Sequence, residues 1–278
     1  MRLYTSSFKF SFSDLFLPVM NDKKHDVEEK VEREAEPIEV SEVGGDVELI
    51  EKLLKSEPRT DKLDAQLISL TIMSGIVALI GLFLNNAAIV IGAMVISPLL
   101  APVYALSIYA VMGRYREALE NLRVLIILII LIMVFSAIMT FVFSFFWSLQ
   151  ITPEILSRTK GHEILIMMAV ILGMAVVIAH TRGFPDTIIG IGIAIALIPP
   201  AVVTGLSFVI YREGFLPALI LTINNILGLI IGSFLALISL GVGPKWYFKK
   251  EESKKILIRI LVLLVVILVI LTILMNLL

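Results

Sequence analysis

The sequence contains long stretches without a charged residue, and this feature most limits what the chain can fold into. Residues 65–113 contain no Asp, Glu, Lys or Arg. Five more charge-free stretches follow, at 124–153, 164–181, 187–211, 214–244 and 260–278. Because a membrane-spanning helix needs about 20 apolar residues, these stretches are long enough to cross a bilayer. A soluble domain would need far more polar surface than a chain that is 58% hydrophobic and 17% charged can supply.

The pattern predicts an all-α, polytopic helical membrane protein of about seven spans. The predicted spans are residues 65–84, 87–111, 124–146, 163–181, 187–211, 215–240 and 257–278.

The segments around these spans are expected to be short. Residues 1–64 are expected to be cytoplasmic and largely disordered, because residues 21–64 hold 15 acids and 8 bases. Hydrophobic spacing predicts a short amphipathic helix near 46–56. The outer loop 147–162 is expected to hold a short helix capped by Thr152.

Basic residues near the ends of the spans predict the orientation in the cell membrane. With the N-terminus inside, thirteen Lys and Arg residues flank the spans on the inner side and three, Arg158, Lys160 and Arg212, on the outer side. By the positive-inside rule, the N-terminus is cytoplasmic and the C-terminus lies outside.

Spans two and five share a design that predicts an internal repeat. Each is a long apolar segment with prolines in the middle, Pro98 and Pro102 in one and Pro199 and Pro200 in the other. Proline removes a backbone donor and clashes with the preceding turn, so both helices are expected to kink or break.

The flanking spans pair in the same way, one with four and three with six. Repeat one covers residues 65–146, repeat two covers 163–240, and residues 241–278 add a basic inner loop and a C-terminal span. Because each unit has three helices, an odd number, the second unit enters the membrane from the opposite side. Inverted repeats of this kind place transporter sites at discontinuous helices near the midplane. The alternative is that the prolines are ordinary packing kinks.

At these residues the chain resembles a family of hydrophobic membrane proteins, domain of unknown function 389. The resemblance is carried by the segments Gly81–Leu99, Thr152–Thr159, Ala194–Pro200 and Thr222–Gly228. It implies a multi-pass membrane domain and no established substrate or reaction. Other members tend to have an acid followed by Ser-Pro where this chain has Asn85, Asn86 and Ala87. Any family role of that carboxylate is therefore in doubt here.

The candidate substrate-binding residues lie in the two proline segments, in the turns that follow Pro200 in span five, and in span six. They are Ser97, Pro98, Pro102, Pro199, Pro200, Thr204, Ser207, Asn224 and Asn225. Asn224 shares an i, i+4 stripe with Gly228 and Gly232, which favours close helix packing with Asn224 either bonded across it or coordinating a ligand. A hydroxyl stripe in span three, which includes Ser136 and Thr140, is read as packing or as the lining of a polar pathway.

Several functions are not indicated by the residues present. The chain has no cysteine, and its histidines at 25, 162 and 180 form no ligand cluster, so neither a metal nor another cofactor is expected. No catalytic arrangement or phosphate-binding loop is visible, so we expect no enzyme. The inner basic residues follow from the topology, so no nucleic-acid partner is expected.

The leading hypothesis is a transporter or channel for a small solute or ion, with its site at the two proline segments. The alternative is a non-transporting assembly or signalling component that acts through the N-terminal region. The C-terminal span, residues 257–278, is rich in Ile, Leu and Val and lacks small residues. It is expected to face lipid, and its position also suits a homo-oligomer interface.

Overall fold

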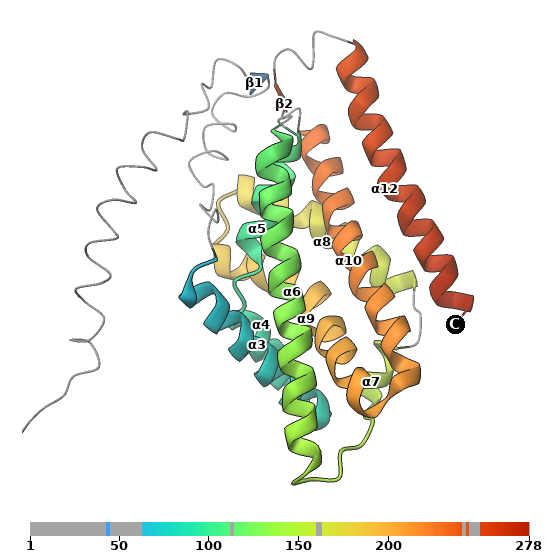
Figure 1. Ribbon diagram of the computed structural model, residues 1–278. Coiled ribbons are helices and arrows are strands. Elements are labelled where there is room, and N and C mark those ends of the chain that lie inside the picture. The colour runs from blue at the N-terminus through green and yellow to red at the C-terminus, as the bar shows by residue number, and fades with distance from the viewer. Residues whose placement is uncertain are drawn as a thin grey trace, which may run out of the picture. The chain divides into compact units, whose positions relative to one another are not determined.

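The charge-free stretches form helices that lie close to the predicted spans. The computed structural model describes residues 43–44, 63–111, 114–159, 163–240, 243–244 and 251–277. Its helices are α3 (Ala65–Phe83), α4 (Ala87–Ile96), α5 (Leu100–Val111), α6 (Tyr115–Ser144), α7 (Pro153–Leu156), α8 (Glu163–Thr181), α9 (Asp186–Ile210), α10 (Arg212–Ser239) and α12 (Glu251–Leu277) (Figure 1).

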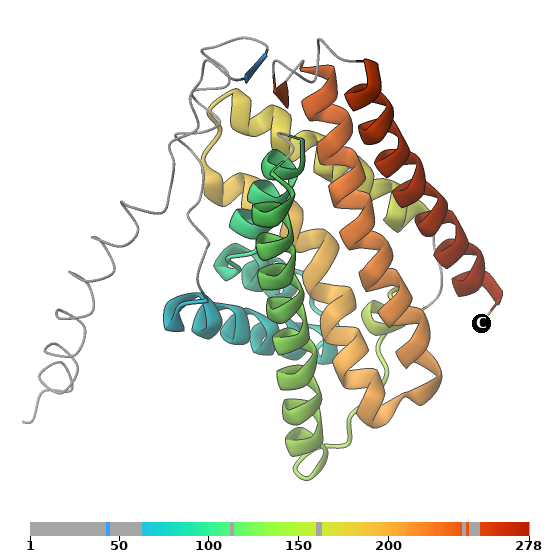
Figure 2. The ribbon, with the colours of Figure 1, turned by 45° about the horizontal axis from the view of Figure 1, so that its top comes forward.

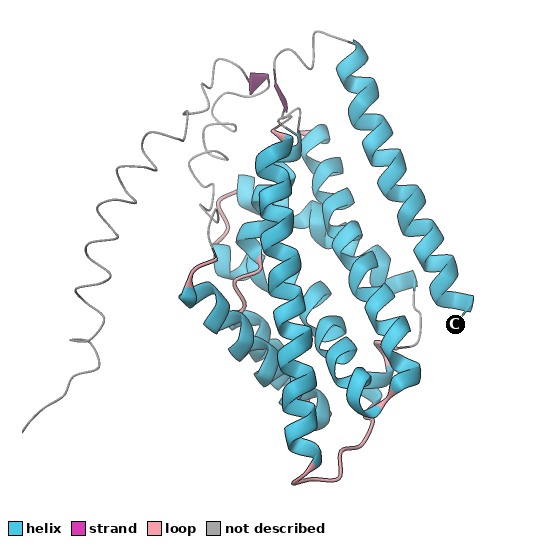
Figure 3. Ribbon diagram, in the orientation of Figure 1, coloured by secondary structure: helices cyan, strands magenta, loops and turns pink. Residues whose placement is uncertain are grey.

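Extended structure is confined to one short pairing in the described residues. The strand β1 (Val43–Gly44) pairs antiparallel with β2 (Gly243–Pro244), and helices make up nearly all the rest (Figure 3). The amphipathic helix predicted near 46–56 falls outside the described residues.

Six of the described helices are long and apolar enough to cross a membrane, and the bent pair α4–α5 makes a seventh span if it is counted as one. The two helices of the pair meet at 60°. The prediction of an all-α, polytopic membrane protein is therefore confirmed.

Helices α9 and α10 form the centre of the bundle. They contact each other extensively, and α9 also packs against α3, α4, α5, α6 and α8. Most of both helices is buried, whereas only 6% of the most apolar part of α12 is buried. Figures 1 and 2 show α12 along the outside of the bundle beside α10. The predicted peripheral position of the C-terminal helix is thus confirmed.

Glycines allow the central helices to approach closely. A Cβ on Gly232 of α10 would lie 2.0 Å from the carbonyl oxygen of Val170 in α8, and one on Gly173 would lie 2.3 Å from that of Leu229. Helices that pack so closely need small residues at the contact. The stripe predicted from Gly228 and Gly232 therefore does face another helix, α8.

The loop after α6 docks onto the tip of the α3–α4 hairpin. The Thr152 hydroxyl donates to the carbonyl of Leu82 at 2.7 Å, and the Glu154 amide donates to the Asn85 side chain at 3.3 Å. Asn85 has a φ of 49°, a left-handed conformation that asparagine tolerates in turns. The Thr152 side chain also caps α7, as predicted.

Candidate functional site

The first proline segment breaks its helix, as the sequence predicts. Residues 97–99 separate α4 from α5, and Ser97 is extended, with φ −71° and ψ 129°. Proline disfavours the helical conformation of the preceding residue, so Pro98 accounts for the extended backbone of Ser97. Pro102 lies in the first turn of α5, where a missing N–H breaks no helical bond.

The break leaves a carbonyl of α4 that a neighbouring helix satisfies. The Ser97 amide donates to Met94 at 3.2 Å, so it does not reach Ala93, its usual helical acceptor. The hydroxyl of Ser74 in α3 donates to the Ala93 carbonyl instead, at 2.9 Å. The Ser97 hydroxyl is buried and has no hydrogen-bond partner in the structure.

The second proline segment does not break its helix, so of the predicted kink or break the structure excludes the break. Helix α9 runs without interruption through Pro199 and Pro200, both buried. Pro200 cannot donate to the carbonyl of Ala196, but the side-chain amide of Asn225 in α10 does so at 2.8 Å. A donor from a neighbouring helix can preserve a proline-containing membrane helix.

The first proline segment contacts α9 at Gly190, before the prolines of that helix. A Cβ on Gly190 of α9 would lie 3.5 Å from the Cβ of Leu100, which begins α5. Pro199 follows Gly190 by nine residues, or about 13 Å along an α-helix. The start of α5 therefore contacts α9 well before its prolines.

Polar groups between α9 and α10 form a buried set that we call the polar seam. It consists of the carbonyls of Ala196 and Pro200 and the side chains of Thr204, Thr222 and Asn225. The three side chains are at most 2% exposed. The two threonine oxygens lie 3.4 Å apart, and Thr204 also donates to the Pro200 carbonyl at 2.8 Å.

The remaining candidates occupy different surroundings. Asn224, adjacent to Asn225, points to another neighbour and donates to Thr272 of α12 at 3.5 Å. The sequence predicts an interhelical bond across the stripe of Gly228 and Gly232, but these glycines face α8 and the bond of Asn224 goes to α12. Ser207 is fully buried one turn after Thr204, and its hydroxyl has no hydrogen-bond partner in the structure. Thus the structure brings Pro200, Thr204 and Asn225 together and leaves Ser97 and Asn224 elsewhere.

Some polar residues of the core were not predicted as site residues. Thr222 lies three residues before Asn225, so the i, i+3 spacing places both on one helix face and could have identified it. Ser136, known from the sequence only as part of a hydroxyl stripe, lies beside α9. A Cβ on Gly205 would lie 2.9 Å from its Cβ.

A buried aromatic pair joins α5 to α8. The rings of Tyr104 and His180 lie with their centroids 4.1 Å apart, and both side chains are buried. Within the described part of the chain, no group of three or more His, Cys, Asp or Glu residues could hold a metal ion.

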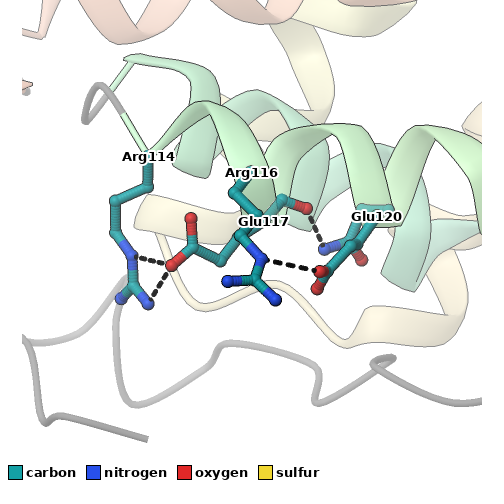
Figure 4. Close-up of polar contacts among 5 residues, drawn as sticks. Arg114, Arg116, Glu117 and Glu120 are labelled. Carbon is teal, nitrogen blue, oxygen red and sulfur yellow. Dashed lines mark hydrogen bonds and ion pairs between the residues drawn. The ribbon is translucent and has the colours of Figure 1, made fainter.

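Charged groups lie outside this core. At the start of α6, Arg114 bonds Glu117 through two nitrogens and Arg116 bonds Glu120 at 3.4 Å (Figure 4). Near α7, burial lowers the pKa of the Arg158 guanidinium, and the carboxylate of Glu154 partly opposes this effect. The polar seam is therefore composed of uncharged groups.

This multi-pass helical membrane chain is similar to a known protein family. Residues 94–231 match the family model described as "Domain of unknown function (DUF389)". The resemblance predicted from the sequence is therefore confirmed over these residues.

The chain is also 32% identical over 185 residues to an uncharacterised protein from Methanocaldococcus jannaschii. This match covers 66% of the chain and 57% of the archaeal protein, so the chain spans less than two thirds of the length of that relative. No solved structure matches the chain.

Proposed function

We propose that the protein is a transporter or channel for a small solute or ion, with the polar seam as its binding site. The observation that carries this proposal is a set of buried polar groups between α9 and α10, the two most buried of the six long apolar helices. Polar side chains inside membrane proteins typically face the bundle interior and often mark solute or ion pathways. The protein is expected to move its solute without changing it chemically.

Packing within the two halves supports an inverted repeat, which we propose as the basis of the architecture. In the first half, Gly75 of α3 packs against Ile132 of α6, with a Cβ position 3.4 Å from its side chain. In the second half, Gly173 of α8 packs against Leu229 of α10. The glycines are 98 residues apart in sequence and their partners 97. The first and third helices of each unit thus meet at equivalent positions.

The distribution of charge supports the proposed orientation in the cell membrane. The start of α6, with Arg114 and Arg116, lies at the same end of the bundle as the end of α10 and the start of α12 (Figures 1 and 2). Helix α7 lies at the opposite end. An inner face at the arginine-bearing end agrees with the positive-inside rule and leaves the N-terminus cytoplasmic and the C-terminus outside.

The peripheral helix α12 is the surface that we propose for a homo-oligomer. Many of its large apolar side chains are exposed, and they include Val262, Leu263 and Ile270. The surrounding lipid bilayer is the alternative neighbour of the same face.

Flux measurements in proteoliposomes test the transport proposal. Purified protein is reconstituted, and the uptake of monovalent ions and of small uncharged polar solutes is compared with that of empty liposomes. Thr204→Val and Thr222→Val should reduce the flux, because each removes a hydroxyl from the polar seam. Thr71→Val is the matched control, since Thr71 is also fully buried and bonded to its own helix, in α3. An absence of flux above that of empty liposomes for every solute would contradict the proposal.

A further inference from the structure

The polar seam has more acceptor than donor capacity. Thr204 and Thr222 each have one hydroxyl hydrogen. The hydroxyl oxygen of Thr204 lies 2.8 Å from the Pro200 carbonyl, and that of Thr222 lies 2.8 Å from the Ala218 carbonyl. These carbonyls are the nearer acceptors, so we assign both hydrogens to them rather than to the contact between the two hydroxyls. The two threonine oxygens therefore face each other across 3.4 Å with lone pairs.

Other groups on the same helices add to this surplus of acceptors. The amide nitrogen of Asn225 donates to Ala196, while its side-chain oxygen is buried and has no hydrogen-bond partner. Pro199 has no N–H, so the Ile195 carbonyl cannot receive its usual helical bond. Buried acceptors without a donor are energetically costly, so such a set favours an electropositive ligand.

The absence of charge in the seam restricts the charge of that ligand. No Asp or Glu is among the buried side chains of the described residues. Divalent cations such as Ca²⁺ and Mg²⁺ are normally held with the help of carboxylates. No described Lys or Arg side chain is fully buried either, so the seam offers an anion no charged partner. Neutral carbonyl, amide and hydroxyl oxygens suit a monovalent cation, as carbonyl rings do in potassium channels.

We propose that the polar seam binds a partly dehydrated monovalent cation through the oxygens of Thr204, Thr222 and Asn225. This inference rests on the proposed function, because it names the class of substrate or coupling ion that the same site accepts. It is tested by binding rather than by flux, so the two proposals can fail separately.

The experiment measures the thermal unfolding midpoint of the purified full-length protein against NaCl and KCl concentration. N-methyl-D-glucamine chloride replaces the salt, so that ionic strength and chloride stay constant. A saturable rise of the midpoint with Na⁺ or K⁺ is expected, because a ligand that binds the folded state stabilises it.

Variants locate the binding. Thr204→Val and Thr222→Val should each raise the half-maximal cation concentration about tenfold or more, the loss expected when one bond to a charged group is removed. Thr222→Ser keeps the hydroxyl and should resemble the wild type, as should the control Thr71→Val. If Thr222→Val does not fold, the comparison of Thr204→Val with Thr204→Ser locates the binding instead.

Two results would overturn the inference: a midpoint that neither Na⁺ nor K⁺ changes, or a cation effect that the seam variants leave intact. Flux of uncharged solutes without any effect of Na⁺ or K⁺ on the midpoint would support the transport proposal and contradict cation binding. Cation binding without any flux would support cation binding and contradict the transport proposal.

Discussion

The side-chain amide of Asn225 donates to the backbone carbonyl of Ala196 at 2.8 Å and supplies the hydrogen bond that Pro200 cannot make. A proline inside a helix ordinarily costs about 3 kcal/mol or more. Because the donor comes from α10, the continuity of α9 depends on its packing against that helix. The polar seam is thus a structural support as well as the proposed binding site.

This relationship predicts an energetic coupling between Asn225 and Pro200. Asn225→Ala should lower the free energy of unfolding by about 1–3 kcal/mol, since it leaves a buried carbonyl without a donor. Pro200→Ala restores a backbone N–H at position 200. The cost of Asn225→Ala should therefore be much smaller in a Pro200→Ala background. Reversible unfolding of the four proteins of this cycle in mixed detergent micelles measures the coupling. Equal costs in the two backgrounds would show that the amide does not replace the missing donor.

The neighbouring residue Asn224 offers a matched comparison. It is equally buried, but its amide reaches Thr272 only at 3.5 Å, and that hydroxyl already donates to Leu268 in its own helix. Interhelical bonds of this kind contribute about 0.6 kcal/mol on average. Asn224→Ala should therefore destabilise the protein by about that amount, measured in the same micelles. A loss as large as that of Asn225→Ala would contradict the ranking.

The closest helix contact predicts a strong effect of a single methyl group. In Gly232→Ala the new Cβ would lie 2.0 Å from the carbonyl oxygen of Val170, so α8 and α10 must separate. We expect a loss of stability of about 3 kcal/mol or more, at or above the upper end for overpacking, because backbone cannot move aside as a side chain can. Gly92→Ala in α4 is the control, since no atom lies within 4 Å of its Cβ position. That control should be neutral or stabilising, because alanine favours helix over glycine. The thermal unfolding midpoint distinguishes the two, and similar midpoints would show that α8 and α10 do not pack this closely.

The sequence predicts a kink or a break at both proline segments but not which segment breaks, for a physical reason. The break at Ser97 and Pro98 follows from local backbone sterics, which adjacent residues determine. The continuity of α9 depends on Asn225, which lies 29 residues after Ala196 in the sequence. No local sequence pattern indicates that these two groups meet.

The candidate site was also only partly predictable from the sequence. Thr204 and Asn225 stand out in the sequence as polar residues in apolar helices, and both belong to the polar seam. That Asn224 faces α12 while Asn225 faces α9 depends on the rotation of α10, which packing sets. The contact of Tyr104 with His180 joins residues 76 positions apart and likewise leaves no periodic signal.

The docking of α7 on the α3–α4 hairpin predicts a cross-link between these two elements. Asn85 and Glu154 are joined by a bond of 3.3 Å, and the chain has no native cysteine to interfere. In the double variant Asn85→Cys, Glu154→Cys, a short bifunctional thiol reagent should join the two residues, visible as a changed gel mobility. Each single variant is the control and should give no intramolecular product. If the double variant gives none either, the docked arrangement is wrong.

The proposed orientation can be tested with the same cysteine-free chain. Ser148 lies in the exposed loop after α6, and Arg116 is exposed at the start of that helix. With the N-terminus inside, Ser148→Cys should react with a membrane-impermeant maleimide in intact cells. Arg116→Cys should react only after the membrane is permeabilised, because thirteen of sixteen flanking bases lie on its side. The ratio of labelling before and after permeabilisation is the measurement, and the unmodified chain is the blank. If Arg116→Cys were the residue labelled in intact cells, the topology would be reversed and α7 would face the cytoplasm.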